Sequence, residues 1–533
     1  MKVCVQTIQP FALTLLLLIG CKSEVIVNSD IKYQPVKSVS LNPYKSVQFR
    51  DPTSQNPNLT LGVSIAGGGS RAQYFGIGVL LGLEEIKDPN NSESNRNFLS
   101  EIDYLSTVSG GGFAAGYYLT IKKNVLFKSS RFSTFNEFWL SKARIDSLQE
   151  FLGAKSDLKE VLNAKRYEKN KKSLSFPSRI DWELLQYSKI DLQGQSIDRM
   201  FLSDLFIPAG SDKPPLFPIL VTNGTIYNNL ERLPFMPHII EDLQITRSLM
   251  PEQPLSSDNT VSNGYNLPLT YAITASSAFP GILPQVKFGI KESANKVIRV
   301  IDGGVVDNLG YTTLIELLKE DKNPNPNKRA LIIDCSAAGQ SDRFSNNEII
   351  KTFPLVEDAL LFTVDSKYMY HQHDIQTELL NSDIPRENYF VIGISTLRTE
   401  LNNLDETKYP DLSARRAKLR SEIGLKESNS QAKARWENLF FEFETSIIST
   451  IKPNVDGHIL ATSYDDNNLR PIDLLTNEDF ENITPLQTLL LYELASQIET
   501  RIQIWRLEKS ILTLAGRYAV FLKRKEIEKL YQL

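Results

Sequence analysis

Cysteine is rare in this chain, with three residues among 533. Cys4 lies within, and Cys21 at the end of, an N-terminal stretch that has the features of an export signal. Cys335 lies in the apolar run 330–335, which has the pattern of a buried strand. Because the signal would be removed and Cys21 is expected to carry lipid, no pair remains. We therefore expect the exported fold to be stable without a disulfide bond.

An excess of positive charge is also absent. The formal net charge is −4, which gives no overall basic surface. Nucleic acid is therefore not expected as the main partner, since phosphate binding needs a clustered basic field. With 41% apolar and 23% charged residues, the composition is that of an ordinary globular protein. The length of 533 residues predicts one large domain with additions.

The apolar run near the N-terminus, residues 11–19, is too short to span a bilayer comfortably. It follows the cationic Lys2 and ends in Leu18-Ile19-Gly20-Cys21, which resembles a bacterial lipobox. We therefore expect residues 1–20 to be a lipoprotein signal peptide, with a plain secretory signal as the alternative. Acyl chains on Cys21 would anchor the protein in the bacterial cell envelope, periplasmic or surface-facing, through about 0.8 kcal/mol per buried methylene.

Beyond the signal, the pattern along the chain predicts an α/β domain. Residues 21–57 are polar and interrupted by prolines, as in a tether. Over residues 58–398, apolar strand-like runs alternate with helix-like segments, which favours a mostly parallel central sheet covered by helices on both faces. The predicted strands are residues 61–66, 102–108, 217–221, 297–301, 330–335 and 389–394. The predicted helices include residues 73–86, 113–121 and 311–319.

Two long segments do not follow this alternation. Residues 125–210 are polar, charged and helix-prone, and we interpret them as a solvated helical insertion or as a lid over the site. Residues 399–533 have the pattern of long amphipathic helices. The final stretch, residues 502–533, mixes apolar and basic residues, which suits either an anionic membrane surface or packing against the main domain.

Ser109 lies at a sharp turn between a predicted strand and a predicted helix. A serine on such a turn is held out from the backbone, and its neighbours must be small. Gly110 and the two glycines that follow meet this requirement, and the helix directs its first amides and its positive dipole end at the serine. Thr107 stands where the usual pattern of such turns has glycine, which crowds the turn. The pattern indicates either a nucleophile or an ordinary strand-to-helix turn.

The run Gly67-Gly68-Gly69-Ser70-Arg71 directly follows the first predicted strand. Because Gly67, Gly68 and Gly69 lack side chains, an oxyanion can approach their N–H groups closely, and Gly110 is expected to supply a further amide. Arg71 is expected either to fix this loop or to bind a lipid phosphate. A nucleotide-binding loop is disfavoured, because the Lys-Ser/Thr end of a Walker motif is missing.

Asp302-Gly303-Gly304 ends the predicted strand 297–301. We expect the Asp302 carboxylate at the sheet edge where α/β sites form, as the general base that takes the proton of Ser109. The alternative is an ordinary Asp-Gly turn. Asp307 and Asn308, just beyond, are expected to be turn or cap residues.

Histidine, the commonest general base, is scarce and far in sequence from all three motifs, which favours a Ser-Asp dyad. The chain has four histidines, His238, His371, His373 and His458. A metal site at His371 and His373 is disfavoured, because no Cys or carboxylate cluster accompanies it. A triad that uses His238 or His458 is the other alternative.

Taken together and in this order, the motifs resemble those of the patatin-like phospholipase family. The glycine-rich run matches the family's oxyanion loop, Ser109 its nucleophile elbow and Asp302-Gly303-Gly304 its catalytic-aspartate motif. Residues 275–284 resemble its Ala-Ser-x-Ala-x-Pro segment, and residues 302–308 also resemble the catalytic domain of cytosolic phospholipase A2. The resemblance implies a three-layer α/β/α fold, a Ser-Asp dyad and acyl-ester hydrolysis without a metal or cofactor.

The expected function is that of a membrane-anchored lipid acyl hydrolase. Its expected partners are a membrane surface and a phospholipid, lysophospholipid or other acyl-ester lipid, which the anchor would place beside the site. Acyl transfer through the same dyad is one alternative. A non-catalytic lipoprotein that binds lipid or a partner is the other. The sequence leaves the acyl position, the head group and the oligomeric state open.

Overall fold

The computed structural model describes a part of the chain, and the account below is confined to it. The described residues are 59–87, 96–127, 132–140, 200–206, 217–227, 229–248, 264–279, 286–290, 297–321, 327–335, 388–402, 404, 410–411, 414–415, 417–419, 429–451, 470–498, 504 and 506–531. The expected signal peptide 1–20, the lipidated Cys21 and the tether 21–57 lie outside these residues. So does most of the expected insertion 125–210.

The described strands form one nine-stranded mixed sheet in the order β5-β6-β7-β3-β2-β1-β8-β9, with β4 also paired to β3. The strands are β1 (Thr60–Ile65), β2 (Ile102–Val108), β3 (Ile219–Ile226), β4 (Glu231–Pro234), β5 (Ile245–Ser248), β6 (Val286–Ile290), β7 (Val297–Asp302), β8 (Lys328–Asp334) and β9 (Tyr389–Gly393). The neighbours β3, β2, β1, β8 and β9 are parallel. β4, β5, β6 and β7 pair antiparallel with their neighbours.

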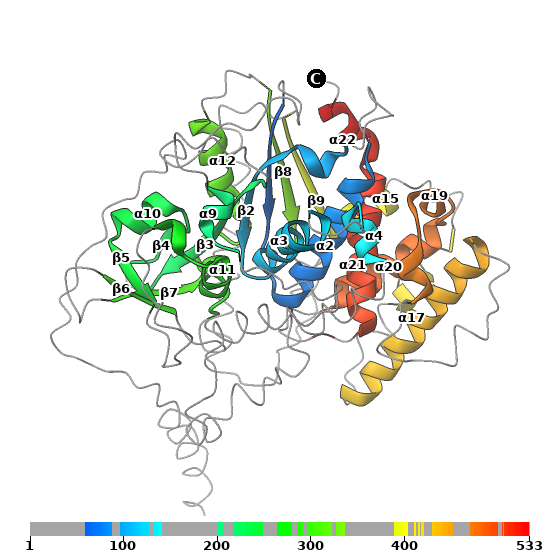
Figure 1. Cartoon of the computed structure of the whole chain (residues 1–533). Coiled ribbons are helices and arrows are strands. Elements are labelled where there is room, and N and C mark those ends of the chain that lie inside the picture. Colours follow the sequence, from blue (N-terminus) through cyan, green and yellow to red (C-terminus); the bar gives the residue numbers. More distant parts are fainter. Residues whose placement is uncertain are drawn as a thin grey trace, which may run out of the picture.

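Helices cover both faces of the parallel strands, which confirms the predicted three-layer α/β/α architecture (Figure 1). Side chains alternate between the two faces along β1. Gly62 faces Leu314 of α12 (Tyr311–Glu320), whereas Ile65 contacts Gly76 of α2 (Gly69–Glu85) on the other face. All six residues of β1 are buried, as expected for a strand covered on both sides.

The remaining described helices surround this core. In the main domain they are η2 (Phe98–Glu101), α3 (Gly110–Ile121), η3 (Lys122–Leu126), α4 (Phe135–Trp139), α9 (Leu202–Leu205), α10 (Pro237–Asp242), η5 (Gly264–Asn266), α11 (Leu269–Ser276) and η6 (Gly303–Val305). Towards the C-terminus they are α15 (Ile394–Asn402), α17 (Asn429–Ile451), η8 (Pro471–Leu474), α19 (Asn477–Phe480), α20 (Pro485–Gln497), α21 (Arg506–Leu522) and α22 (Arg524–Tyr531). Among the described helices, none combines the length and apolar character that a bilayer crossing requires.

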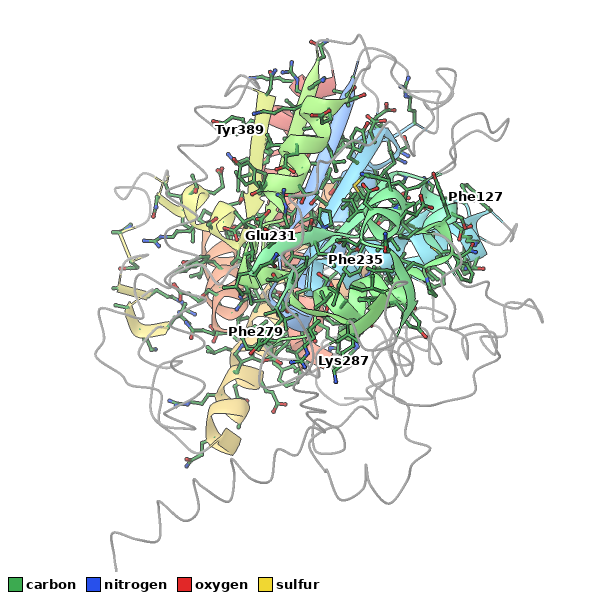
Figure 2. The ribbon with its side chains drawn as sticks, turned by 90° about the vertical axis from the view of Figure 1, so that its left-hand side faces the viewer. Phe127, Glu231, Phe235, Phe279, Lys287 and Tyr389 are labelled. Atoms are coloured by element: carbon green, nitrogen blue, oxygen red, sulfur yellow. The ribbon has the colours of Figure 1, made fainter. Side chains whose placement is uncertain are left out.

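The direction of β7 brings two strand ends together. Strand β2 pairs with β3 up to Val108, which lies opposite Asn223. Strand β7 runs the other way and ends at Asp302, which lies opposite Gly224. Because Asn223 and Gly224 are consecutive, the carboxyl ends of β2 and β7 reach neighbouring positions on β3. The segment that follows α11 lies at this end as well. Figure 2 shows Tyr389, which begins β9, near the upper end of the sheet and Phe279 near the lower end.

The C-terminal helix α21 packs against α2, so it is part of the main domain's helical layer (Figure 1). A Cβ atom added to Gly78 of α2 would lie 2.2 Å from the Thr513 carbonyl oxygen, and one added to Gly516 would lie 2.4 Å from that of Phe75. Arg517 of α21 also pairs with Glu85 at 2.6 Å. Of the two interpretations of this stretch, packing against the main domain is therefore confirmed for α21.

Candidate active site

Ser109 has a strained backbone at the turn between β2 and α3. Its φ of 47° and ψ of −120° lie in a region that residues with a Cβ atom rarely adopt. Such a conformation costs about 1–3 kcal/mol and persists only where the surroundings enforce it. Its side chain is nearly buried, with 8% of the residue exposed. The structure therefore presents the serine on a strained elbow, as the sequence pattern predicts.

Glycines around Ser109 allow two backbone segments to touch. A Cβ atom on Gly110 would lie 2.0 Å from the Gly69 carbonyl oxygen, and one on Gly111 would lie 2.4 Å from that of Ile65. The first turns of α2 and α3 are therefore in direct contact. Thr107 does not crowd the turn, because its hydroxyl lies 3.3 Å from the Thr222 hydroxyl on the neighbouring strand. It stays clear of Gly112, whose added Cβ atom would be 3.5 Å away.

The Asp302 carboxylate accepts hydrogen bonds from two neighbouring groups. The Ser109 side chain donates a hydrogen bond to the Asp302 carboxylate. The amide of Gly304 donates a second hydrogen bond at 2.7 Å, and the Asp302 amide itself donates to the Ala278 carbonyl at 3.0 Å. Burial raises the pKa of Asp302 to about 6, although the hydrogen bonds from Gly304 and Ser109 partly oppose this shift. The carboxylate is therefore a stronger base than an ordinary aspartate.

The three glycines of residues 67–69 differ in what their amides do. Gly68 and Gly69 have positive φ angles of 142° and 58°, a region that favours glycine. Their amides, like that of Gly110, lie at a helix start, where N–H groups have no partner within the helix. The amide of Gly67 instead donates to the Asn308 carbonyl at 2.8 Å. Our expectation that Gly67 supplies an oxyanion donor was therefore wrong, since its N–H group is already engaged.

Asn308 is a part of the site that the sequence analysis missed. Its side-chain oxygen would lie 2.4 Å from a Cβ atom on Gly67 and 2.7 Å from one on Gly304. The side chain thus fills the space between the glycine-rich loop and the turn after Asp302. Asp307 behaves as expected, because its carboxylate accepts from the Thr312 amide at 3.0 Å at the start of α12. The Asn308 contacts join distant parts of the chain, so no local pattern could have revealed them.

Residues 63–315 match a family model described as "Patatin-like phospholipase". They are a patatin-like phospholipase domain. The matched range includes Ser109, Asp302 and the glycine-rich loop. A stretch of 80 residues is also 31% identical to a protein named lysophospholipase 3 from Candida albicans. That stretch is 15% of this chain and 11% of the relative, so the likeness covers a small part of each protein.

Arg71 connects the patatin-like domain to the C-terminal helices. Its guanidinium is buried and donates to the Cys335 carbonyl at 2.9 Å and to the Ile498 carbonyl at 3.2 Å. Cys335 follows β8 and Ile498 follows α20. Of the two roles expected for Arg71, these contacts favour fixing the loop, because the buried guanidinium donates to two main-chain carbonyls of distant segments.

The histidine alternatives gain no support from the described part of the patatin-like domain. His238 lies in α10, which packs against η5 and β5. His371, His373 and His458 lie outside the described residues, as do residues 280–284 of the Ala-Ser-x-Ala-x-Pro segment. Within the described elements, the side chain that meets the Ser109 hydroxyl is a carboxylate.

The strained elbow gives the first test of the patatin-like site. Ser109→Gly removes the Cβ atom from a backbone position with positive φ. It should raise the free energy of unfolding by about 1 kcal/mol relative to Ser109→Ala, because the relieved strain exceeds the entropy cost of glycine. Ser109→Ala removes the same hydroxyl but keeps the strain, so it is the matched control. Urea unfolding of both variants measures the difference. Equal stability of Ser109→Gly and Ser109→Ala would show that the backbone at residue 109 is relaxed.

Proposed function

We propose that this protein is a lipid acyl hydrolase of phospholipase A or lysophospholipase type that uses Ser109 as nucleophile and Asp302 as general base. The observation that carries the proposal is the hydrogen bond from the Ser109 hydroxyl to the buried Asp302 carboxylate. A serine hydroxyl is a weak nucleophile until a base takes its proton as it attacks. A carboxylate in direct contact with a serine on a strained turn meets this requirement.

In the first step, the Ser109 oxygen attacks the acyl carbonyl and its proton moves to Asp302. Burial raises the pKa of Asp302 to about 6, so the group is ionised at neutral pH yet basic enough to accept the proton. The proton then passes from Asp302 to the departing alcohol oxygen, which leaves an acyl ester on Ser109. In the second step Asp302 takes a proton from water, the hydroxide attacks the acyl-enzyme, and Ser109 regains its hydrogen as the fatty acid leaves.

The amides of Gly68, Gly69 and Gly110 supply the proposed oxyanion site. They lie in the first turns of α2 and α3, two helices whose N-termini are in contact. The positive end of each helix dipole stabilises negative charge there. Donors fixed in place need no reorganisation when the tetrahedral oxyanion forms, and each such donor contributes about 3–4 kcal/mol to catalysis. The Ser109 hydroxyl, the Asp302 carboxylate and main-chain amides fill every role in this scheme, so it requires no metal or cofactor.

The proposed substrate class rests on the family match, and the proposed membrane anchoring rests on the N-terminal sequence around Cys21. Patatin-like phospholipase is the description of the matched family, and the partial relative is named a lysophospholipase. We therefore propose a phospholipid or lysophospholipid as the acyl donor. Lipidation of Cys21, with the protein anchored in the bacterial cell envelope, would keep the site beside such a substrate.

Removal of either member of the dyad should abolish fatty-acid release. Ser109→Ala deletes the nucleophile and Asp302→Asn deletes the base, and each should lower kcat by about 10⁴-fold or more, as in other serine hydrolases. Asp307→Asn is the matched control, because Asp307 is also buried but bonds the start of α12. Chromatography of fatty acid released from phospholipid measures the effect. Full activity of purified Ser109→Ala would refute the assignment.

The pH dependence of kcat/KM should report the ionisation of Asp302. The base must be deprotonated to accept the serine proton, so activity falls as pH decreases through about 6, the raised pKa of Asp302. An ordinary exposed aspartate would place this fall near pH 4. Initial rates with a soluble short-chain ester between pH 4 and 8 measure the midpoint. A midpoint at pH 4 would contradict a buried, desolvated base.

A further inference from the structure

The amide of Ser109 is held by a residue outside the proposed dyad and oxyanion site. Its N–H group donates to the Oγ of Ser276 at 2.8 Å. The same Ser276 hydroxyl donates onward to the Asn223 carbonyl at 2.5 Å. Ser276 is the last residue of α11, whereas Ser109 follows β2 and Asn223 lies in β3. One hydroxyl therefore links the elbow to a third part of the fold.

The direction of the Ser276 hydroxyl is unusual within α11. Thr274 and Ser277 bond back to the carbonyls of Thr270 and Ile273, four residues earlier, at 2.7 and 2.8 Å. This is the ordinary local bond of a hydroxyl in a helix. The Ser276 hydroxyl instead reaches across to the strands. It is fully buried, so water does not replace either of its bonds.

Asn223 is itself firmly fixed beside the elbow. Its side-chain amide donates to the Ser106 hydroxyl at 3.0 Å and to the Thr107 carbonyl at 3.1 Å. Its side-chain oxygen accepts from the Thr313 hydroxyl at 2.5 Å. Both N–H groups of this buried amide are therefore paired. The carbonyl to which Ser276 donates thus belongs to a residue that also fixes the last residues of β2.

A strained turn needs such support to hold its side chain in place. The backbone of Ser109 has a strained φ of 47°, so rotation of its peptide plane away from this conformation would lower the free energy of the turn. Rotation of that plane would carry the Ser109 hydroxyl away from Asp302. The bond from the Ser109 amide to Ser276 opposes the rotation, because breaking it leaves a buried N–H group without this acceptor.

We propose that Ser276 is a positioning residue, which holds the Ser109 amide so that the serine hydroxyl faces Asp302. This inference rests on the proposed function and assigns a task to the first serine of the Ala-Ser-x-Ala-x-Pro segment. Ser276 touches neither the substrate carbonyl nor the transferred proton. Its contribution should therefore appear in kcat, through the geometry of the nucleophile, and not in the binding of lipid.

The test compares Ser276→Ala with Ser277→Ala. Both serines are buried neighbours at the end of α11, but the Ser277 hydroxyl bonds its own helix. Ser276→Ala should lower kcat by about 10- to 100-fold with KM within about twofold of wild type, because a misplaced nucleophile loses transition-state and not ground-state stabilisation. The rate of Ser109 labelling by a fluorophosphonate should fall in parallel. Ser277→Ala should match wild type in both readouts.

The outcomes separate this inference from the proposed function. Equal kcat in Ser276→Ala and Ser277→Ala would overturn the inference, as would a rise in KM alone. Activity that survives in Ser109→Ala would instead overturn the proposed function. If Ser276→Ala does not fold, Ser276→Cys tests the same point with a side chain of similar size and a weak acceptor. A folded Ser276→Cys with wild-type kcat would equally refute the positioning role.

Discussion

The hydrogen bond between the Ser109 hydroxyl and the Asp302 carboxylate forms where two strands of opposite direction end beside each other. Strand β3 makes this possible, because it pairs with parallel β2 as far as Asn223 and with antiparallel β7 from Gly224 onward. The mixed direction of the sheet thus brings the Ser109 hydroxyl and the Asp302 carboxylate into contact within a buried setting, which raises the pKa of Asp302.

Close backbone contact is the second constraint on the site. The N-terminal turns of α2 and α3 touch through Gly69 and Gly110, so the first amides and the dipole ends of both helices lie together beside Ser109. The position of α2 depends in turn on residues beyond the matched range 63–315. Helix α21 packs on it through glycine contacts, and Arg71 bonds the Ile498 carbonyl. The C-terminal helices therefore complete the helical layer that carries the glycine-rich loop.

Six of the nine described strands were predicted from the sequence, whereas the short antiparallel strands β4, β5 and β6, and the contacts between the elements, were not. Ser109, Asp302 and the glycine-rich loop follow apolar strands directly, and strand-to-turn signals are local. The antiparallel direction of β7 leaves no such signal. The other features that the sequence analysis missed depend on contacts between distant residues. The Asn308 carbonyl accepts a hydrogen bond from the Gly67 amide, and the Ser276 hydroxyl accepts one from the Ser109 amide. Arg71 bonds the carbonyls of Cys335 and Ile498, which lie far from the glycine-rich loop in the sequence.

The central claim is that Asp302 activates Ser109 through direct contact. Peptide mass spectrometry of the native protein after reaction with a long-chain fluorophosphonate tests it most directly, because this reagent reacts with activated serines. The account predicts that the phosphonyl group is found on Ser109 in the wild-type protein and is absent in folded Asp302→Asn. Labelling of another serine, or undiminished labelling of Ser109 in Asp302→Asn, would contradict it.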